Sequence, residues 1–148
     1  MTEELLWRMT EAEAAYIAGL IDGEGTIALH VDSRGSYGGS RMRLMPSITI
    51  VSIDSSIITW LKEVTRCGYI SHRSFSDRRR DQWTFNVNAV DELRRILVCV
   101  LPHLRIKKKH GELLLIYCSE RIKGKPFTDV EKEIYYDLKE LNIRGKSS

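Results

Sequence analysis

Residues 16–25 of the chain read YIAGLIDGEG, an apolar stretch that runs into two acids separated by a glycine. The apolar part is typical of a helix, but Gly19 and Gly23 each destabilise a helix by about 1 kcal/mol relative to alanine. Asp22 and Glu24 would lie at the negative end of the helix dipole, where acids are unfavourable. Because these unfavourable features coincide, we expect the stretch to have a role beyond packing a core.

Gly19 and Gly23 are four residues apart, so they share one face of the predicted helix with Tyr16 and Leu20. Small residues at this spacing let two helix backbones approach closely. A second copy of the helix would bring two Glu24 carboxylates together, and a divalent cation between them would offset their repulsion. Glu24 and the backbone carbonyl of Gly23 offer the oxygen ligands that Mg²⁺ prefers. An amphipathic core helix with a glycine stop is the plainer alternative.

The 148 residues, 43% hydrophobic and 29% charged, are typical of one globular domain spanning 1–148, with a frayed tail from about 143. No apolar run approaches the roughly 20 residues that cross a bilayer, and the N-terminus lacks a signal-peptide layout. We therefore expect an intracellular protein of the cytoplasm, nucleoid or an organelle, not secreted and without a membrane partner. Three distant cysteines and four histidines without ligand spacing argue against a disulfide framework and a zinc site.

Alternating and helical patterns predict an α+β fold with the element order αββαββα. Strands are expected at 26–32, 41–53, 68–75 and 83–88, and helices at 10–22, 56–66, 90–101, from there to about 122, and from 128 to about 141. Thr10–Glu13 and Thr128–Glu131 have the capping-box pattern and are expected to open the first and the last helix. Gly23 and Gly25 are expected to stop the first helix, and Pro46 indicates an edge strand or a bulge. Paired strands imply antiparallel hairpins, hence a curved sheet with helices on one face.

The net charge is +3, and the basic residues gather in clusters, which favours a localised nucleic-acid surface. The face of the sheet without helices would be polar and basic, and it could lie along a DNA groove. An ordinary solvated face is the alternative. The residues expected to contact DNA from the strands and their turns are His30, Asp32, Arg34, Ser36, Tyr37, Arg41, Arg43, Ser71, Arg73, Arg78, Arg79, Arg80, Thr84, Asn86 and Asn88.

Ile17–Gly25, IAGLIDGEG, resembles the signature of the LAGLIDADG homing endonucleases, and six of its nine letters are identical to the name. Glu24 replaces the second Asp and keeps the carboxylate. The resemblance implies a site-specific endonuclease of double-stranded DNA, with no small-molecule substrate, that makes a metal-dependent staggered cut. It also implies Mg²⁺ as the cofactor, with Mn²⁺ or Ca²⁺ as other possible ligands, and an intron-encoded origin.

Chains of this family with a single motif are homodimers, and this chain has a single motif. The resemblance therefore implies a nearly palindromic target and an interface that contains Tyr16, Gly19, Leu20, Asp22 and Gly23. One Glu24 would lie in each of two adjacent active sites.

The resemblance also suggests two further catalytic residues. Asp54 follows the second strand, where the family often has a Gln that orients water, although a plain helix N-cap is an equal alternative. PHLRIKKKH resembles the segment that carries the family's active-site lysine, which places it at Lys107. Arg105 and Lys109 would then contact phosphates, unless the segment is simply a solvated basic helix face.

Two other functions fit the same residues. An RNA maturase or a non-catalytic DNA-binding regulator of this type would keep the helix packing, and a regulator could lose the acid. A dimerisation module with an incidental basic face would explain Gly19 and Gly23 but not the position of Glu24.

Overall fold

The computed structural model describes residues 9–31, 43–122 and 124–147. Its elements are α2 (Glu11–Glu24), β1 (Gly25–Val31), β2 (Leu44–Ser52), α3 (Ser55–Thr65), β3 (Tyr69–Arg73), β4 (Gln82–Val87), α4 (Val90–Val100), the short 3₁₀ helix η2 (Leu101–His103), α5 (Lys108–Glu120) and α6 (Asp129–Ser147). The predicted α+β class and the order αββαββα are confirmed, and further helices follow as expected. None of the helices in the described part of the chain is long and apolar enough to cross a membrane.

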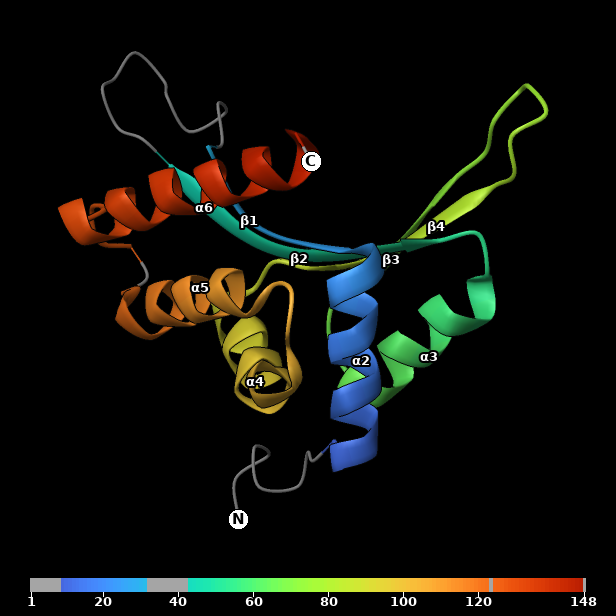
Figure 1. Cartoon of the computed structure of the whole chain (residues 1–148), viewed down its shortest axis with the longest axis horizontal. Helices are drawn as coiled ribbons and strands as arrows, with labels where there is room; N and C mark the ends of the chain where they lie inside the picture. Colours follow the sequence, from blue (N-terminus) through green and yellow to red (C-terminus); the bar gives the residue numbers. More distant parts are fainter. Residues whose placement is uncertain (1–8, 32–42, 123, 148) are drawn as a thin grey trace.

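The four strands form one antiparallel sheet in the order β1-β2-β4-β3. Ile27 lies opposite Ile48, and Ile48 lies opposite Val87. Because directly opposite residues point to the same side of a sheet, these three side chains share one face, and all are buried. Helices α2, α3, α4 and α5 lie along this side of the sheet, as Figure 1 shows. The core therefore forms between one face of the sheet and the helices, and the other face carries the alternate residues.

Helix α2 begins with the predicted capping box. Thr10 Oγ1 accepts a hydrogen bond from the backbone N–H of Glu13 at 3.0 Å, and the Thr10 N–H donates to Glu13 Oε1 at 2.8 Å. These two bonds satisfy N–H groups that a helix start leaves without partners. Ile17 and Ile21 then direct one side of the helix into the core.

The end of α2 differs from the prediction that Gly23 stops the helix. The helix runs through Gly23 to Glu24, and Gly25 is its C-cap, with its N–H donating to the carbonyl of Ile21. A Cβ atom at Gly25 would lie 2.7 Å from Ile21 Cα, closer than real side chains come to a backbone. Gly25 is therefore the residue that this junction requires, and strand β1 starts on it with no loop between.

Pro46 lies in β2, which is an inner strand of the sheet, so the prediction of an edge strand was wrong for β2 as a whole. However, β4 pairs only with Ile48–Ser52, and Pro46 lies beyond that stretch with β1 as its strand partner. Its carbonyl accepts a hydrogen bond from Asn88 Nδ2 at 3.2 Å. The proline is tolerated because one side of the strand has no ladder at this position.

Helix α6 covers the outer side of β1, the terminal strand of the sheet order. Asn142 Nδ2 donates to the carbonyl of Ile27 at 3.0 Å, and Ile134 and Leu138 are buried in the core. An uncovered strand edge would be open to pairing with other chains, so this helix protects β1. It continues to Ser147, past the predicted end near 141, since no proline interrupts the pattern.

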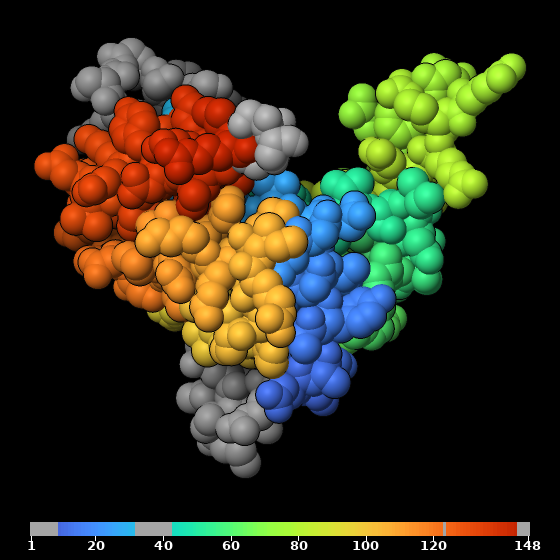
Figure 2. Space-filling view, in the orientation of Figure 1, coloured from blue at the N-terminus to red at the C-terminus, as the bar shows by residue number. Residues whose placement is uncertain are grey.

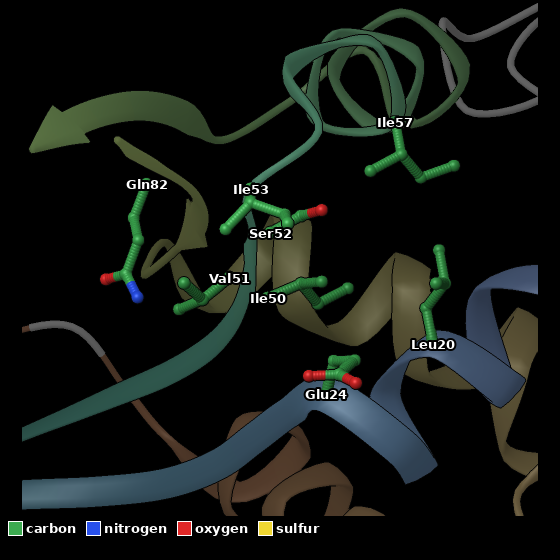
Figure 3. Close-up of a pocket in the computed structure, with 8 residues that line it drawn as sticks. All are labelled: Leu20, Glu24, Ile50, Val51, Ser52, Ile53, Ile57 and Gln82. Carbon is green, nitrogen blue, oxygen red and sulfur yellow. The ribbon is translucent and has the colours of Figure 1, made fainter. Parts of the chain in front are cut away.

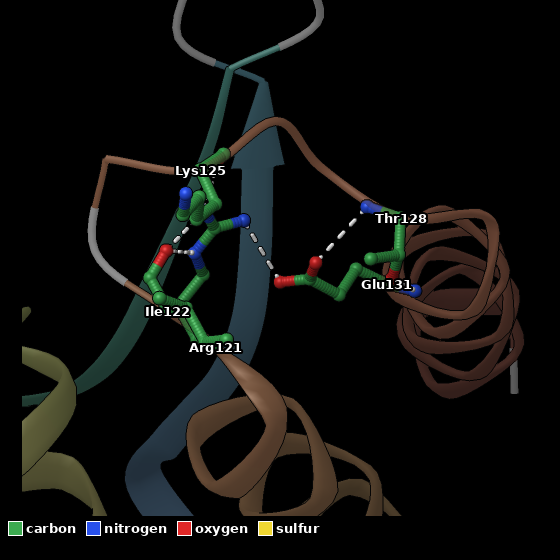
Figure 4. A network of polar contacts seen from close by, with 5 residues as sticks. All are labelled: Arg121, Ile122, Lys125, Thr128 and Glu131. Atoms are coloured by element: carbon green, nitrogen blue, oxygen red, sulfur yellow. Dashed lines mark hydrogen bonds and ion pairs between the residues drawn. The ribbon is translucent and has the colours of Figure 1, made fainter.

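A buried ion pair holds α6 against the end of α5 (Figure 4). Arg121 Nη1 lies 3.0 Å from Glu131 Oε2, and both side chains are less than a tenth exposed. Arg121 also donates to the carbonyls of Ile122 and Lys125 in the connection between the helices. Glu131 Oε1 accepts from the N–H of Thr128 at 3.0 Å and so completes the second predicted capping box. Both charged groups thus have further hydrogen-bond partners on the backbone, which a buried ion pair requires.

Candidate active site and open face of the sheet

Glu24 is exposed at the end of α2, on the rim of a cavity of about 300 Å³. Figure 3 shows the cavity between the end of α2, the end of β2, the start of β4 and Ile57 of α3. Most of its lining is apolar, from Leu20, Ile50 and Val51, together with Ile53 just after β2 and Ile57 of α3. Its polar side chains are those of Glu24, Ser52 and Gln82. A cavity lined by a carboxylate, a hydroxyl and an amide is suited to hold a cation or water.

The oxygen atoms at the end of α2 are suited to bind a hard divalent cation. The carbonyl of Gly23 lies in the last turn of the helix, where no N–H four residues on continues the ladder, and Glu24 adds a carboxylate. Both are oxygen ligands of the kind that Mg²⁺ and Ca²⁺ take. Among the described residues, no three or more His, Cys, Asp and Glu side chains lie close enough together to hold a metal ion. One chain thus offers few ligands, and a second copy would double them.

Lys107 reaches the same helix end from a distant part of the sequence. Its Nζ donates to the carbonyl of Asp22 at 2.9 Å, and the side chain is partly buried. An ammonium group at this position compensates the negative end of the helix dipole. The family resemblance implies that Lys107 lies near the acid motif, and the structure brings the two segments together.

Asp22 fixes the backbone that carries Lys107. One carboxylate oxygen accepts from the N–H of Arg105 and the other from the N–H of Lys107, both at 2.9 Å. Partial burial raises the pKa of Asp22, but the N–H groups of Lys107, Arg105 and Ile106 outweigh it, so the pKa lies below its ordinary value. This contact interrupts the helix predicted between Pro102 and 122, and α5 begins only at Lys108. Asp22 therefore holds the loop before α5 against the end of α2 in the same chain.

Four of the five residues predicted for a dimer interface form an exposed strip on α2, namely Tyr16, Gly19, Leu20 and Gly23, whereas the Asp22 carboxylate is bonded to its own chain. A Cβ atom at Gly19 or at Gly23 would meet nothing within 4 Å. Tyr16 is 55% exposed, and its ring lies edge-on to that of Trp60 with centroids 5.3 Å apart. Leu20 is half-buried at the cavity. The chain itself leaves room along this strip, although its partner stays a prediction.

Asp54 does not line the cavity of Glu24. Its Oδ1 accepts hydrogen bonds from the backbone N–H and the hydroxyl of Ser56, at 2.8 and 2.6 Å. These bonds, the hydroxyl bond foremost, lower the pKa of Asp54 and make it the N-cap of α3. The N-cap role of Asp54 is thus present, while its catalytic role stays a prediction; the polar residues that line the cavity together with Glu24 are Ser52 and Gln82.

The sheet face opposite the helices, here called the open face, carries the polar residues predicted for DNA contact. Thr26, Thr49, Asn86 and Tyr69 lie opposite one another in turn, so this row crosses all four strands. The described candidates on the strands of this face are His30, Ser71, Arg73, Thr84 and Asn86, and Asn88 follows directly after β4. The predicted alternation of polar and apolar faces is thus present, while DNA contact stays a prediction.

Several predicted DNA contacts have partners within the chain. Asn86 Nδ2 donates to Ser71 Oγ at 3.2 Å, which ties β4 to β3. Arg79 is paired with Asp77, whereas Arg78 and Arg80 are exposed. Arg43, Arg105 and Lys109 are exposed beside the sheet and the start of α5. The remaining candidates, Asp32, Arg34, Ser36, Tyr37 and Arg41, lie outside the described residues.

Five polar residues of the open face and the cavity were not predicted from the sequence, namely Thr26, Thr49, Ser52, Tyr69 and Gln82. Tyr69 is 55% exposed on the open face, in step with Ser71 and Arg73. The alternation of the GYISHR stretch could have identified it. Gln82 lies opposite Arg73, and Thr26 opposite Thr49. Ser52 could not have been found from the sequence, because its place at the cavity depends on how α2 meets β2.

Comparison with known proteins shows likeness in structure. No family model matches the chain, and no curated protein matches it in sequence. The homing endonuclease I-CvuI, solved in complex with its DNA target and Ca, is 20% identical with a TM-score of 0.63, over 89% of this chain and 96% of that one. The archaeal intron-encoded homing endonuclease I-Vdi141I, complexed with DNA, is 16% identical with a TM-score of 0.60, over 90% and 98%.

A longer protein matches over part of its length. The LAGLIDADG homing endonuclease I-GzeII, in complex with a DNA target, is 16% identical with a TM-score of 0.59, over 86% of this chain but 43% of that one. The chain is thus similar both to chains of about its own length and to part of a chain about twice as long. The chain has the fold of the LAGLIDADG homing endonucleases, in agreement with the resemblance of Ile17–Gly25 to their signature.

Proposed function

We propose that the protein is a site-specific endonuclease of double-stranded DNA that works as a homodimer with a divalent cation. The observation that carries the proposal is the position of Glu24. This exposed carboxylate stands at the cavity where the end of α2 meets the sheet, and Lys107 is fixed at the same helix end. Structural neighbours such as I-Vdi141I and I-GzeII were solved with DNA, which supports DNA as the substrate.

In this mechanism, Glu24 and the Gly23 carbonyl would hold the cation, most simply Mg²⁺. A bound divalent ion polarises a phosphate and lowers the pKa of a water molecule. Lys107 places positive charge beside the phosphate and stabilises the negative charge that develops in the transition state. Asp22 keeps the Lys107 backbone in place through its two hydrogen bonds. Ser52 and Gln82 can hydrogen-bond water at the cavity.

Two copies related by a two-fold axis would place one Glu24 near each strand of a duplex. The exposed Gly19 and Gly23 allow the two α2 helices to approach, and the two open faces would then form one long surface. A two-fold symmetric protein favours a nearly palindromic site and a staggered pair of cuts.

Cleavage of randomised duplexes in Mg²⁺, followed by sequencing of the cut ends, tests the proposal. We expect Glu24→Gln to bind the selected site as the wild type does but to cleave it at least about a hundredfold more slowly. Glu63→Gln, at an exposed acid of α3, is the matched control and should cleave normally. If the wild type binds specific DNA without cutting it, the protein is a DNA-binding regulator. If Glu24→Gln loses binding and cleavage equally, the role of Glu24 as a metal ligand is refuted.

The homodimer has a test of its own. Gly19→Leu adds a side chain where nothing lies within 4 Å in the same chain, so the fold should persist. If α2 is the interface, sedimentation should show a monomer for this variant and a dimer for the wild type. Glu133→Leu, at an exposed position of α6, is the control that should leave the dimer intact. A dimer mass in both variants would refute the α2 interface.

A further inference from the structure

The tip segment, residues 74–81 between β3 and β4, stands away from the body of the molecule in Figures 1 and 2. Both of its flanking strands contribute to the open face through Arg73 and Gln82, which lie opposite each other. An arm of this kind has few core contacts to hold its side chains. Long arginine side chains on it would ordinarily be free to move, and ordering them on binding would cost free energy.

Phe75 is half-buried, whereas Ser74 before it and residues 76–80 after it are exposed. The guanidinium carbon of Arg79 lies 4.2 Å from the centroid of the Phe75 ring. The guanidinium carbon of Arg73 lies 5.0 Å from the same centroid. One aromatic ring thus contacts two guanidinium groups, one from β3 and one from the returning half of the tip. Both distances are within the range of cation–π attraction.

Asp77 fixes the second of these arginines. Arg79 Nε lies 3.0 and 2.9 Å from the two carboxylate oxygens of Asp77, and the Arg79 N–H donates to Oδ1 at 2.8 Å. These bonds lower the pKa of Asp77, with the side-chain bond to Arg79 foremost. The charge of Arg79 is therefore compensated by Asp77, and its guanidinium group is held against the Phe75 ring.

Arg73 is in a different situation. A guanidinium group that stacks on a ring uses its flat face and keeps the N–H donors at its edge available. No hydrogen bond or ion pair of Arg73 is found among the described residues. Arg73 lies on the open face, opposite Gln82. The next pair of residues on the same face is Ser71 and Thr84. A held guanidinium with free edge donors is suited to the O6 and N7 acceptors of guanine in a major groove.

We propose that Phe75 is a positioning residue for sequence recognition, which holds Arg73 ready to read a guanine while Arg79 and Asp77 lock the tip. The inference rests on the proposed function, since it names the residues with which that DNA is read. The proposal also assigns different roles to the three arginines at 78–80, which were predicted together as DNA contacts. Arg79 acts within the protein, and the exposed Arg78 and Arg80 supply phosphate contacts without base preference.

The test uses the full-length protein and the duplex site selected with the wild type, together with every single-base variant of that site. Phe75→Leu should weaken binding of the selected site by about three- to tenfold, the cost of ordering one or more long side chains. Phe75→Leu should lose discrimination at one guanine of the site, and Arg73→Ala should lose discrimination at the same guanine. The affinity for non-specific duplexes should change less than twofold. Phe75→Tyr should bind as the wild type does, and Ser76→Ala, on the same tip, is the matched control.

A second measurement examines the free protein. In NMR spectra the side-chain protons of Arg73 and Arg79 should carry upfield ring-current shifts that Phe75→Leu removes and Phe75→Tyr keeps. Loss of these shifts with unchanged base discrimination would overturn the positioning role, as would an equal loss of affinity on all duplexes. If no base pair responds to Arg73→Ala while the wild type still cuts a defined site, the inference fails and the endonuclease stands. If the wild type shows no sequence preference at all, both fail.

Discussion

Asp22→Asn separates the two acids of the motif, because Asp22 is used inside the chain and Glu24 is not. The wild-type carboxylate accepts two backbone hydrogen bonds at 2.9 Å, one on each oxygen, from residues 83 and 85 positions away. The amide keeps one acceptor and turns an NH₂ group toward the other N–H. Hydrogen bonds to a charged group contribute about 1.5–3 kcal/mol each and neutral ones about 1 kcal/mol. Since Asp22 is partly exposed, we expect the low end, a loss of about 1–3 kcal/mol.

The pH dependence follows from the lowered pKa. A carboxyl group whose pKa is lower in the folded state stabilises the fold at pH values above its unfolded pKa, here 3.8. That contribution is lost as the pH falls through the lower pKa of the folded state. The difference in unfolding free energy between wild type and Asp22→Asn should therefore be constant near neutral pH and should shrink below pH 3.8.

Urea unfolding followed by tryptophan fluorescence measures this difference. It should be done at one protein concentration, because a dimer's stability depends on concentration. For a chain of this size, the predicted loss corresponds to a thermal midpoint lower by roughly 2–12 °C. Glu24→Gln is the control and should change the unfolding free energy by less than about 0.5 kcal/mol, as an exposed site. Equal midpoints for wild type and Asp22→Asn would show that the contact does not hold the loop before α5.

Two further predictions concern the fold. Glu131→Ala leaves Arg121 as a buried charge without its carboxylate and should destabilise the protein by about 3–5 kcal/mol in urea, whereas loss of the exposed Glu140 should cost under about 1 kcal/mol. Gly25→Ala forces a Cβ against the backbone of α2 and should cost about 1–3 kcal/mol or more, measured by thermal unfolding. Ser119→Ala, at an exposed position of α5 outside the proposed interface, is its control and should change the unfolding free energy by less than about 0.5 kcal/mol.

Local patterns were sufficient for the elements of this fold. Both capping boxes form as predicted, because each is made by residues three positions apart. The alternation along 83–88 placed Phe85 and Val87 in the core and Thr84 and Asn86 on the open face. These interactions depend on neighbours in the sequence or on the period of a strand, and both are visible in a single chain.

The contacts that build the site depend on distant residues instead. The loop before α5 exists because Asp22 draws the N–H groups of Arg105 and Lys107 away from a continuous helix. Gln82 joins the cavity because β4 starts where β2 ends. No spacing in the sequence encodes either approach, so the sequence predicted that Lys107 lies near the motif but not that Asp22 holds it there.

The glycines of the motif divide into two kinds, and the division explains how Glu24 is placed. Gly25 has no room for a Cβ, since it brings β1 against the last turn of α2, while Gly19 and Gly23 face open space. Because the strand starts directly after the helix, the direction of Glu24 is set by helix length alone. One residue more or less would turn it by about 100° around the helix axis, away from Ser52 and Gln82. The close packing at Gly25 therefore places Glu24, the exposed strip and the open face at the same end of α2. The low helix propensity of glycine alone would not reveal this role.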